Sequence, residues 1–73
     1  LLPDSIYDIE IGMTKQEVDS KLTYSSGNLV GSEESNDGQK CEIYRYKISS
    51  DYYLLTFCGG KLTKWVKEDY NKE

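Results

Sequence analysis

The segment most informative about the fold reads IEIGMTKQEV and runs from Ile9 to Val18. Thr14 suits the N-cap of a helix, because its side-chain oxygen accepts a hydrogen bond from an otherwise unpaired amide of the first turn. Glu17, three residues later, can reach back to the Thr14 amide and complete a capping box. A helix is therefore predicted to begin at Lys15, and a shorter helical turn is predicted before it, over residues 4–8.

Residues on either side of the cap define the rest of this helix. Gly12 allows a sharp chain reversal, and Met13 is placed to pack on Val18 as a hydrophobic staple. Val18 and Leu22 lie four positions apart, on one face of a helix. The helix is expected to end near Thr23.

The composition is that of one small globular domain spanning residues 1–73. Hydrophobic residues make up 37% of the chain and charged residues 30%, and no apolar run approaches the roughly 20 residues of a membrane span. The charged tail over residues 68–73 is expected to fray. Because the chain begins at Leu1, a signal peptide or a lipid anchor further upstream is left open. Membrane attachment is expected only through such an anchor.

Charge and residue usage argue against several function classes. The formal net charge is −4 with nine basic residues, which gives no electrostatic footprint for nucleic acid. The chain has no histidine, so the commonest general base and transition-metal ligand is missing. The paired carboxylates lie in polar segments, and the acidic loop around Glu33 and Asp37 lacks EF-hand spacing and is interpreted as a solvated turn. No enzymatic activity, cofactor or metal is expected.

The second half of the chain has a β pattern, with three strands predicted at residues 41–48, 52–58 and 61–67. Gly59-Gly60 is a strong signal for a two-residue hairpin, and Ser49-Ser50 is a weaker one. A two-residue turn at Ser49-Ser50 would place Cys41 opposite Cys58. Upstream of these strands, Leu29-Val30 is a candidate for a short edge strand.

The two cysteines favour a disulfide between Cys41 and Cys58. Closing a loop of about 18 residues would contribute on the order of 3 kcal/mol by loop entropy, less if the hairpin persists in the unfolded chain. Two free thiols in a cytosolic protein are the alternative. A redox pair is a weaker one, because the C-x-x-C spacing is absent.

Alternation of side chains along the strands sorts the predicted sheet into two faces. The more apolar face is assigned to the core, against Val18 and Leu22, and holds Tyr44, Tyr46, Ile48, Tyr53, Leu55, Phe57, Leu62 and Val66. The opposite face mixes aromatic, aliphatic and cationic groups together with both cysteines, and holds Ile43, Arg45, Lys47, Tyr52, Leu54, Thr56, Lys61, Thr63, Trp65 and Lys67. This mixture is typical of a protein-binding hot spot, and equally of an ordinary solvated face.

The order of these elements resembles the SmpA/OmlA (BamE-like) lipoprotein domain and the related repeat of β-lactamase inhibitory proteins. At the front the resemblance depends on Ile9, Ile11, Gly12, Met13, Thr14, Glu17 and Val18. At the back it depends on Tyr44, Tyr46, Leu55, Phe57, Gly60, Lys61 and Leu62. It covers the chain from about Ile6 to Trp65, and it fails after the helix, where Leu22-Thr23-Tyr24-Ser25 replaces the usual Leu-Gly-x-Pro turn.

The resemblance implies an α+β two-layer sandwich, with two short N-terminal helices packed on one face of a three- to four-stranded antiparallel meander. It also implies export to the cell envelope or the extracellular space, and binding of another protein without catalysis. In the inhibitor-like proteins the helix-free face of the sheet grips the enzyme. By strand parity, the corresponding partner-binding residues here are Ile43, Arg45, Tyr52, Leu54, Thr56 and Trp65.

Three functional hypotheses follow from these expectations. The first is a non-catalytic protein-binding module of an exported or cell-envelope protein. The second is a secreted inhibitor of a hydrolase such as a β-lactamase. The third is a structural or self-associating accessory domain of a surface lipoprotein, so a homodimer is left open.

Overall fold

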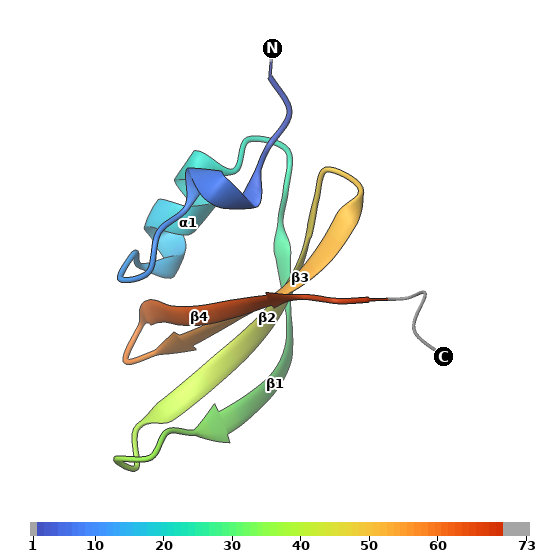
Figure 1. Cartoon of the computed structure of the whole chain (residues 1–73). Coiled ribbons are helices and arrows are strands. Elements are labelled where there is room, and N and C mark those ends of the chain that lie inside the picture. Colours follow the sequence, from blue (N-terminus) through green and yellow to red (C-terminus); the bar gives the residue numbers. More distant parts are fainter. Residues whose placement is uncertain (1, 70–73) are drawn as a thin grey trace.

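The computed structural model describes residues 2–69 of the chain and has an α+β fold with two layers (Figure 1). A 3-10 turn η1 (Ile6–Asp8) and one helix α1 (Lys15–Lys21) lie on one side of a four-stranded sheet. The strands are β1 (Gly27–Glu34), β2 (Lys40–Ile48), β3 (Asp51–Cys58) and β4 (Lys61–Lys67). All neighbouring strands are antiparallel and follow one another in chain order, so the sheet is a simple meander.

The helical layer is smaller than predicted. Thr14 and Glu17 form the expected capping box, with the Glu17 amide donating to Thr14 Oγ1 at 3.1 Å, and α1 begins at Lys15. The first predicted helix, however, is only the three-residue turn η1, capped by Ser5. The expectation of two helices was therefore wrong, and one α-helix is present in residues 2–69. Gly12 has a φ of +100°, as the predicted chain reversal requires.

The central hairpin has the predicted register. Residues 41 and 58, 44 and 55, and 46 and 53 are partners across β2 and β3, in agreement with a two-residue turn at Ser49-Ser50. This register joins Cys41 and Cys58 in a disulfide with a Cα–Cα distance of 4.1 Å. A disulfide in so small a domain is consistent with an oxidising, extracellular setting.

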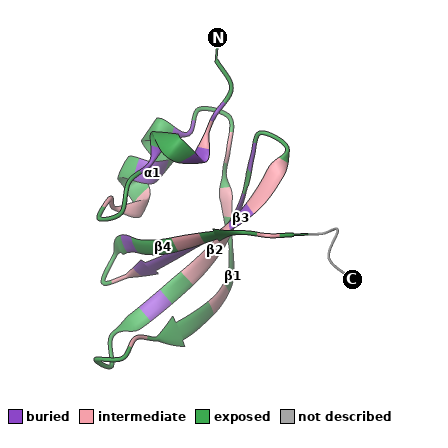
Figure 2. Cartoon of the chain, in the orientation of Figure 1, coloured by how far each residue is buried: buried purple, intermediate pink, exposed green. Residues whose placement is uncertain are grey.

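β1 is longer than the short strand expected at Leu29-Val30. Seven of its eight residues pair with β2, and Val30 is the extra residue of a bulge between Leu29 and Gly31. Gly and Glu are poor strand formers, so local sequence underestimates this strand, and pairing with β2 stabilises it. No residue of β1 is buried, and Figure 2 shows this strand as exposed or intermediate throughout.

A second bulge changes the face of the sheet on which the later side chains of β4 lie. Phe57 pairs with Leu62, but Thr56 pairs with Lys64, so one extra residue lies in β4 between these pairs. The extra residue reverses side-chain parity in the rest of the strand. Trp65 therefore lies on the helix-covered face, where its ring meets Tyr53 edge to face at 5.6 Å, whereas Val66 is 53% exposed. Both of these face assignments from the sequence were wrong.

The core lies between the helical layer and one face of the sheet. Tyr46 is fully buried in this core, and its hydroxyl donates to Asp19 Oδ1 on α1 at 2.6 Å. Its ring also lies over Gly27, where a Cβ would approach Tyr46 Cε1 to 2.3 Å, so β1 must have a glycine there. The buried apolar residues of the cluster are Ile6, Ile9, Val18, Leu22, Tyr46, Ile48, Tyr53, Leu55, Phe57 and Leu62.

Candidate functional site

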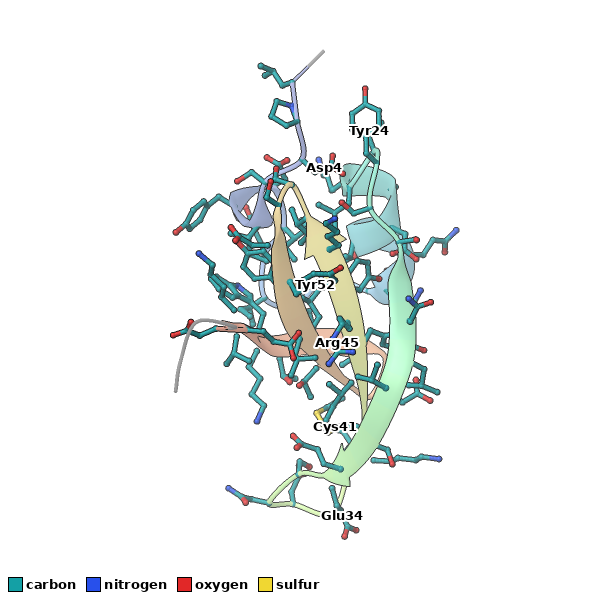
Figure 3. The ribbon with its side chains drawn as sticks, turned by 90° about the vertical axis from the view of Figure 1, so that its right-hand side faces the viewer. Asp4, Tyr24, Glu34, Cys41, Arg45 and Tyr52 are labelled. Atoms are coloured by element: carbon teal, nitrogen blue, oxygen red, sulfur yellow. A yellow bond between two sulfur atoms is a disulfide. The ribbon has the colours of Figure 1, made fainter. Side chains whose placement is uncertain are left out.

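The helix-free face of the sheet carries most of the predicted binding residues. In Figure 3 this face is toward the viewer, with Arg45 on β2 and Tyr52 on β3. The strand register also places Ile43, Leu54 and Thr56 on it, because Ile43 pairs with Thr56 and Arg45 pairs with Leu54. Trp65 is not among them, since the bulge in β4 turns it to the other face.

Five of the six predicted binding residues therefore share a face, but they differ in accessibility. Thr56 is only 4% exposed, and its carbonyl oxygen accepts a hydrogen bond from Thr63 Oγ1 at 3.1 Å. Ile43 and Leu54 are half-buried. Arg45 and Tyr52 are buried to the same intermediate degree, and they are the members of the set that combine partial exposure with a polar group.

Ion pairs cross the helix-free face from its edge at β4. Arg45 makes a bidentate contact with Glu68, with Nε–Oε1 at 2.9 Å and Nη2–Oε2 at 3.1 Å. Lys64 on β4 reaches Glu33 on β1 at 3.3 Å. In a flat four-stranded sheet the two edge strands lie about 14 Å apart. For Lys64 and Glu33 to form an ion pair, the sheet must curve so that its two edges approach each other on this face.

Glu68 was expected to belong to a frayed tail. Instead, its amide donates to the Tyr52 carbonyl oxygen at 2.8 Å, and its carboxylate holds Arg45. Within the rest of the predicted tail, residues 70–73 lie outside the described part of the chain. The segment after β4 therefore contributes a residue to the helix-free face.

An open hollow of about 490 Å³ lies where this face meets the start of β1. Its lining includes Arg45 and Lys47 from β2, Tyr52 from β3 and Asn28 from β1. Lys47 Nζ lies 5.7 Å from the centroid of the Tyr52 ring. Lys47 is exposed and makes no ion pair with another residue in the described range 2–69.

Asp4 fixes the upper wall of the hollow and was not identified from the sequence. Its carboxylate accepts hydrogen bonds from the Thr23 amide at 2.8 Å, the Tyr24 amide at 2.7 Å and Ser25 Oγ at 2.7 Å. Burial alone would raise the pKa of Asp4, but these hydrogen bonds outweigh it and hold the pKa below its usual value. The two amides directly follow the C-cap Leu22 of α1, which ends at Lys21, close to the predicted end near Thr23.

Asp4 also joins three parts of the chain. Its carbonyl oxygen accepts a hydrogen bond from Ser49 Oγ at 2.6 Å, in the turn between β2 and β3. The N-terminal segment, the loop after α1 and this turn are thereby held together. A single aspartate after a proline carries no sequence signal for contacts with residues 19 to 45 positions away.

The other shifted groups do not suggest acid–base chemistry. The pKa of Asp37 is lowered by hydrogen bonds from the Ser35 hydroxyl and the Gln39 amide in the β1–β2 turn. Burial and the hydrogen bond to Asp19 raise the pKa of Tyr46 far above its usual value. In residues 2–69, no group of three or more acidic or cysteine side chains is arranged to hold a metal ion.

Comparisons with known proteins identify no relative of this chain. No family model, no curated protein and no solved structure matches the chain. Within the described residues, no helix is both long and apolar enough to cross a membrane.

Proposed function

We propose that this chain is a non-catalytic protein-binding module of an exported or cell-envelope protein, and that it engages its partner through the helix-free face. The binding surface comprises Arg45, Lys47 and Tyr52, flanked by Ile43 and Leu54. Trp65 is not part of it, because its ring packs on Tyr53 on the covered face.

The observation that carries this proposal is the hollow beside Lys47. A cationic side chain lies there over an aromatic ring, next to a bidentate arginine, in a protein of net charge −4. Arginine and tyrosine are enriched among residues that dominate protein–protein binding energy, because they combine large contact area with directed hydrogen bonds. The sequence resemblance to the SmpA/OmlA (BamE-like) domain favours the same face.

The charges of the hollow indicate the chemistry of the partner. Carboxylates would pair with Lys47 and could compete with Glu68 for Arg45, whose bidentate geometry suits a carboxylate. An apolar side chain beside that carboxylate would pack on the Tyr52 ring. The proposed ligand is therefore an acidic segment of another protein.

A displayed library of random peptides, selected on the purified protein, tests this proposal. We expect the selected peptides to be enriched in Asp and Glu, and their binding to weaken by about tenfold or more in Lys47→Ala and in Tyr52→Ala. Affinities would be measured by titration calorimetry at low and high salt, since exposed charge pairs weaken as salt rises.

Matched controls remove a lysine and a tyrosine side chain from the helical side of the molecule. Lys21 at the end of α1 and Tyr7 in η1 are both exposed, so Lys21→Ala and Tyr7→Ala should bind as the parent does. Peptides without acidic residues, or equal losses in the control variants, would contradict the proposed face.

A hydrolase inhibitor is the special case in which the partner is an enzyme. Stoichiometric addition of the protein would then abolish the activity of that enzyme, and Lys47→Ala would restore it. A β-lactamase panel is the first set to assay, because the sequence resemblance extends to inhibitors of that class.

A further inference from the structure

The ion pair between Arg45 and Glu68 differs in burial and geometry from the other three ion pairs within residues 2–69. The Glu68 side chain is 19% exposed, whereas the carboxylate side chains of the other pairs are between 40% and 47% exposed. Both Glu68 oxygens accept hydrogen bonds from Arg45, one from Nε and one from Nη2. A bidentate, partly desolvated pair is stronger than an exposed single contact. Glu68 therefore holds this edge of the guanidinium firmly.

The backbone of the sheet determines where the Glu68 side chain lies. The Glu68 amide donates to the Tyr52 carbonyl oxygen at 2.8 Å, directly after the pair formed by Lys67 and Tyr53. Val66, two positions earlier, lies opposite Leu54 on the helix-free face. Because side chains alternate along a strand, Glu68 lies on that face as well. The register of β3 and β4 thus places the Glu68 carboxylate within reach of Arg45 on β2.

We propose that Glu68 is an intramolecular competitor, which occupies the Nε and Nη2 edge of Arg45 until the carboxylate of a partner displaces it. This inference rests on the proposed function, because it concerns the same hollow. Arg45, Lys47 and Tyr52 line that hollow, and Glu68 holds Arg45 from outside the lining. An acidic ligand that binds this edge of Arg45 must take the place of Glu68. The contact is therefore autoinhibitory.

Competition by Glu68 lowers the affinity of the site for an acidic ligand. Displacement exchanges one carboxylate for another, so the ligand gains little net interaction energy at Arg45. Glu68 is also attached next to its site, whereas a ligand loses translational freedom when it binds. The apparent dissociation constant rises by the inverse of the fraction of molecules in which Glu68 has released Arg45. Lys47, which makes no ion pair within residues 2–69, then supplies most of the net attraction.

The exchange requires only a small movement. Rotation of the Glu68 side chain takes its carboxylate away from Arg45, while the Glu68 amide keeps its hydrogen bond to Tyr52. A separate ion pair between Lys67 and Asp51, at 3.5 Å, joins the end of β4 to the start of β3. The strands therefore stay paired during the exchange, and the affinity is adjusted by a side chain without unfolding of an element.

Titration of the full chain with a capped hexaglutamate peptide, followed by calorimetry at fixed salt, tests the proposal. We expect Glu68→Gln to lower the dissociation constant about fivefold, because a neutral amide competes less well than a carboxylate for Arg45. Glu33→Gln is the matched control. It removes the same charge from the same face, but the ion-pair partner of Glu33 is Lys64, so the affinity should stay that of the parent.

A second substitution shows whether the gain in affinity comes from Arg45. Adding Arg45→Gln to Glu68→Gln should weaken peptide binding about fivefold relative to Glu68→Gln alone, because the gain depends on the guanidinium that Glu68 had occupied. The double variant also has the formal net charge of the parent, so overall charge does not explain its difference from Glu68→Gln. Circular dichroism would verify that each variant is folded.

The outcomes separate this inference from the proposed function. If the wild type binds the peptide and Glu68→Gln binds it equally or more weakly, Glu68 is no competitor, and the acidic ligand of the hollow is unaffected. An equal gain in Glu33→Gln, or a gain that survives Arg45→Gln, would also overturn the competition. Binding by Glu68→Gln but not by the wild type would support it. Absence of binding by both would refute the acidic ligand and this inference together.

Discussion

The two faces of the sheet are stabilised by different interactions. On the covered face, apolar side chains of three strands pack on η1 and α1, and the buried Tyr46 hydroxyl is paired with Asp19. On the helix-free face, a disulfide and ion pairs between distant parts of the chain hold partly exposed side chains in place. The comparison shows that the covered face is stabilised by buried apolar side chains, whereas the helix-free face is stabilised by a covalent link and ion pairs between segments.

The largest expected difference in stability between the faces comes from substituting two adjacent leucines. Leu55 is fully buried in the core, so Leu55→Ala should lower the free energy of unfolding by about 3–4 kcal/mol. Leu54 points to the opposite face and is half-buried, so Leu54→Ala should cost about 1 kcal/mol. Urea denaturation of both variants measures the difference. Equal losses would show that the helix-free face carries as much of the core as the covered one.

Removing the disulfide, which lies on the helix-free face, should give the next largest loss of stability. Removing it with Cys41→Ala and Cys58→Ala together should lower the free energy of unfolding by about 3 kcal/mol, since the unfolded chain regains loop entropy. Mass spectrometry after alkylation of the non-reduced protein would first verify that neither thiol is free. A double variant as stable as the parent would show that packing on the covered face suffices.

Asp4 should give the smallest of the three effects, and one that depends on pH. Its pKa is lowered in the folded protein, so its ionised form stabilises the fold fully above the unfolded value of 3.8, and this stabilisation is lost as the pH falls through the folded pKa. Charge-assisted hydrogen bonds of this kind contribute about 2 kcal/mol. Asp4→Asn should therefore lower stability by about that amount at pH 7.

The pH series has a built-in control. Wild type and Asp4→Asn should begin to converge in stability as the pH falls below 3.8, and should converge fully only below the lowered pKa of Asp4 in the folded protein. Glu10 is exposed, and Glu10→Gln should have little effect at either pH. A constant difference between wild type and Asp4→Asn from pH 7 to pH 3 would mean that the carboxylate charge does not stabilise the link between the N-terminus and the loop after α1.

The sequence was sufficient where local rules dominate. The capping box at Thr14 and Glu17 started α1 at the predicted residue, because cap hydrogen bonds join residues three positions apart. The turns at Ser49-Ser50 and Gly59-Gly60 set the strand partners, so the opposition of Cys41 and Cys58 followed from counting. Alternation then grouped Arg45 and Tyr52 correctly on one face.

The sequence was insufficient where one inserted residue changes parity. Nothing in the order of residues 61 to 67 marks a bulge, so strict alternation assigned Trp65 to the helix-free face and Val66 to the core. The bulge lets the larger aromatic ring pack on Tyr53, which removes more apolar surface from water than a valine could. The packing of that ring depends on a contact with the neighbouring strand, so the sequence of β4 alone does not indicate it.

What the sequence alone determined about this protein is therefore its set of short-range elements: one capped helix, the tight hairpins and the cysteine pair. Tertiary structure alone decided the extent of β1, the face of Trp65, the link at Asp4 and the contact between Glu68 and Arg45. The physical reason is range. Caps and turns are satisfied by neighbours in the chain, whereas strand extension, bulges and buried carboxylates are stabilised by partners that come close only when the chain has folded.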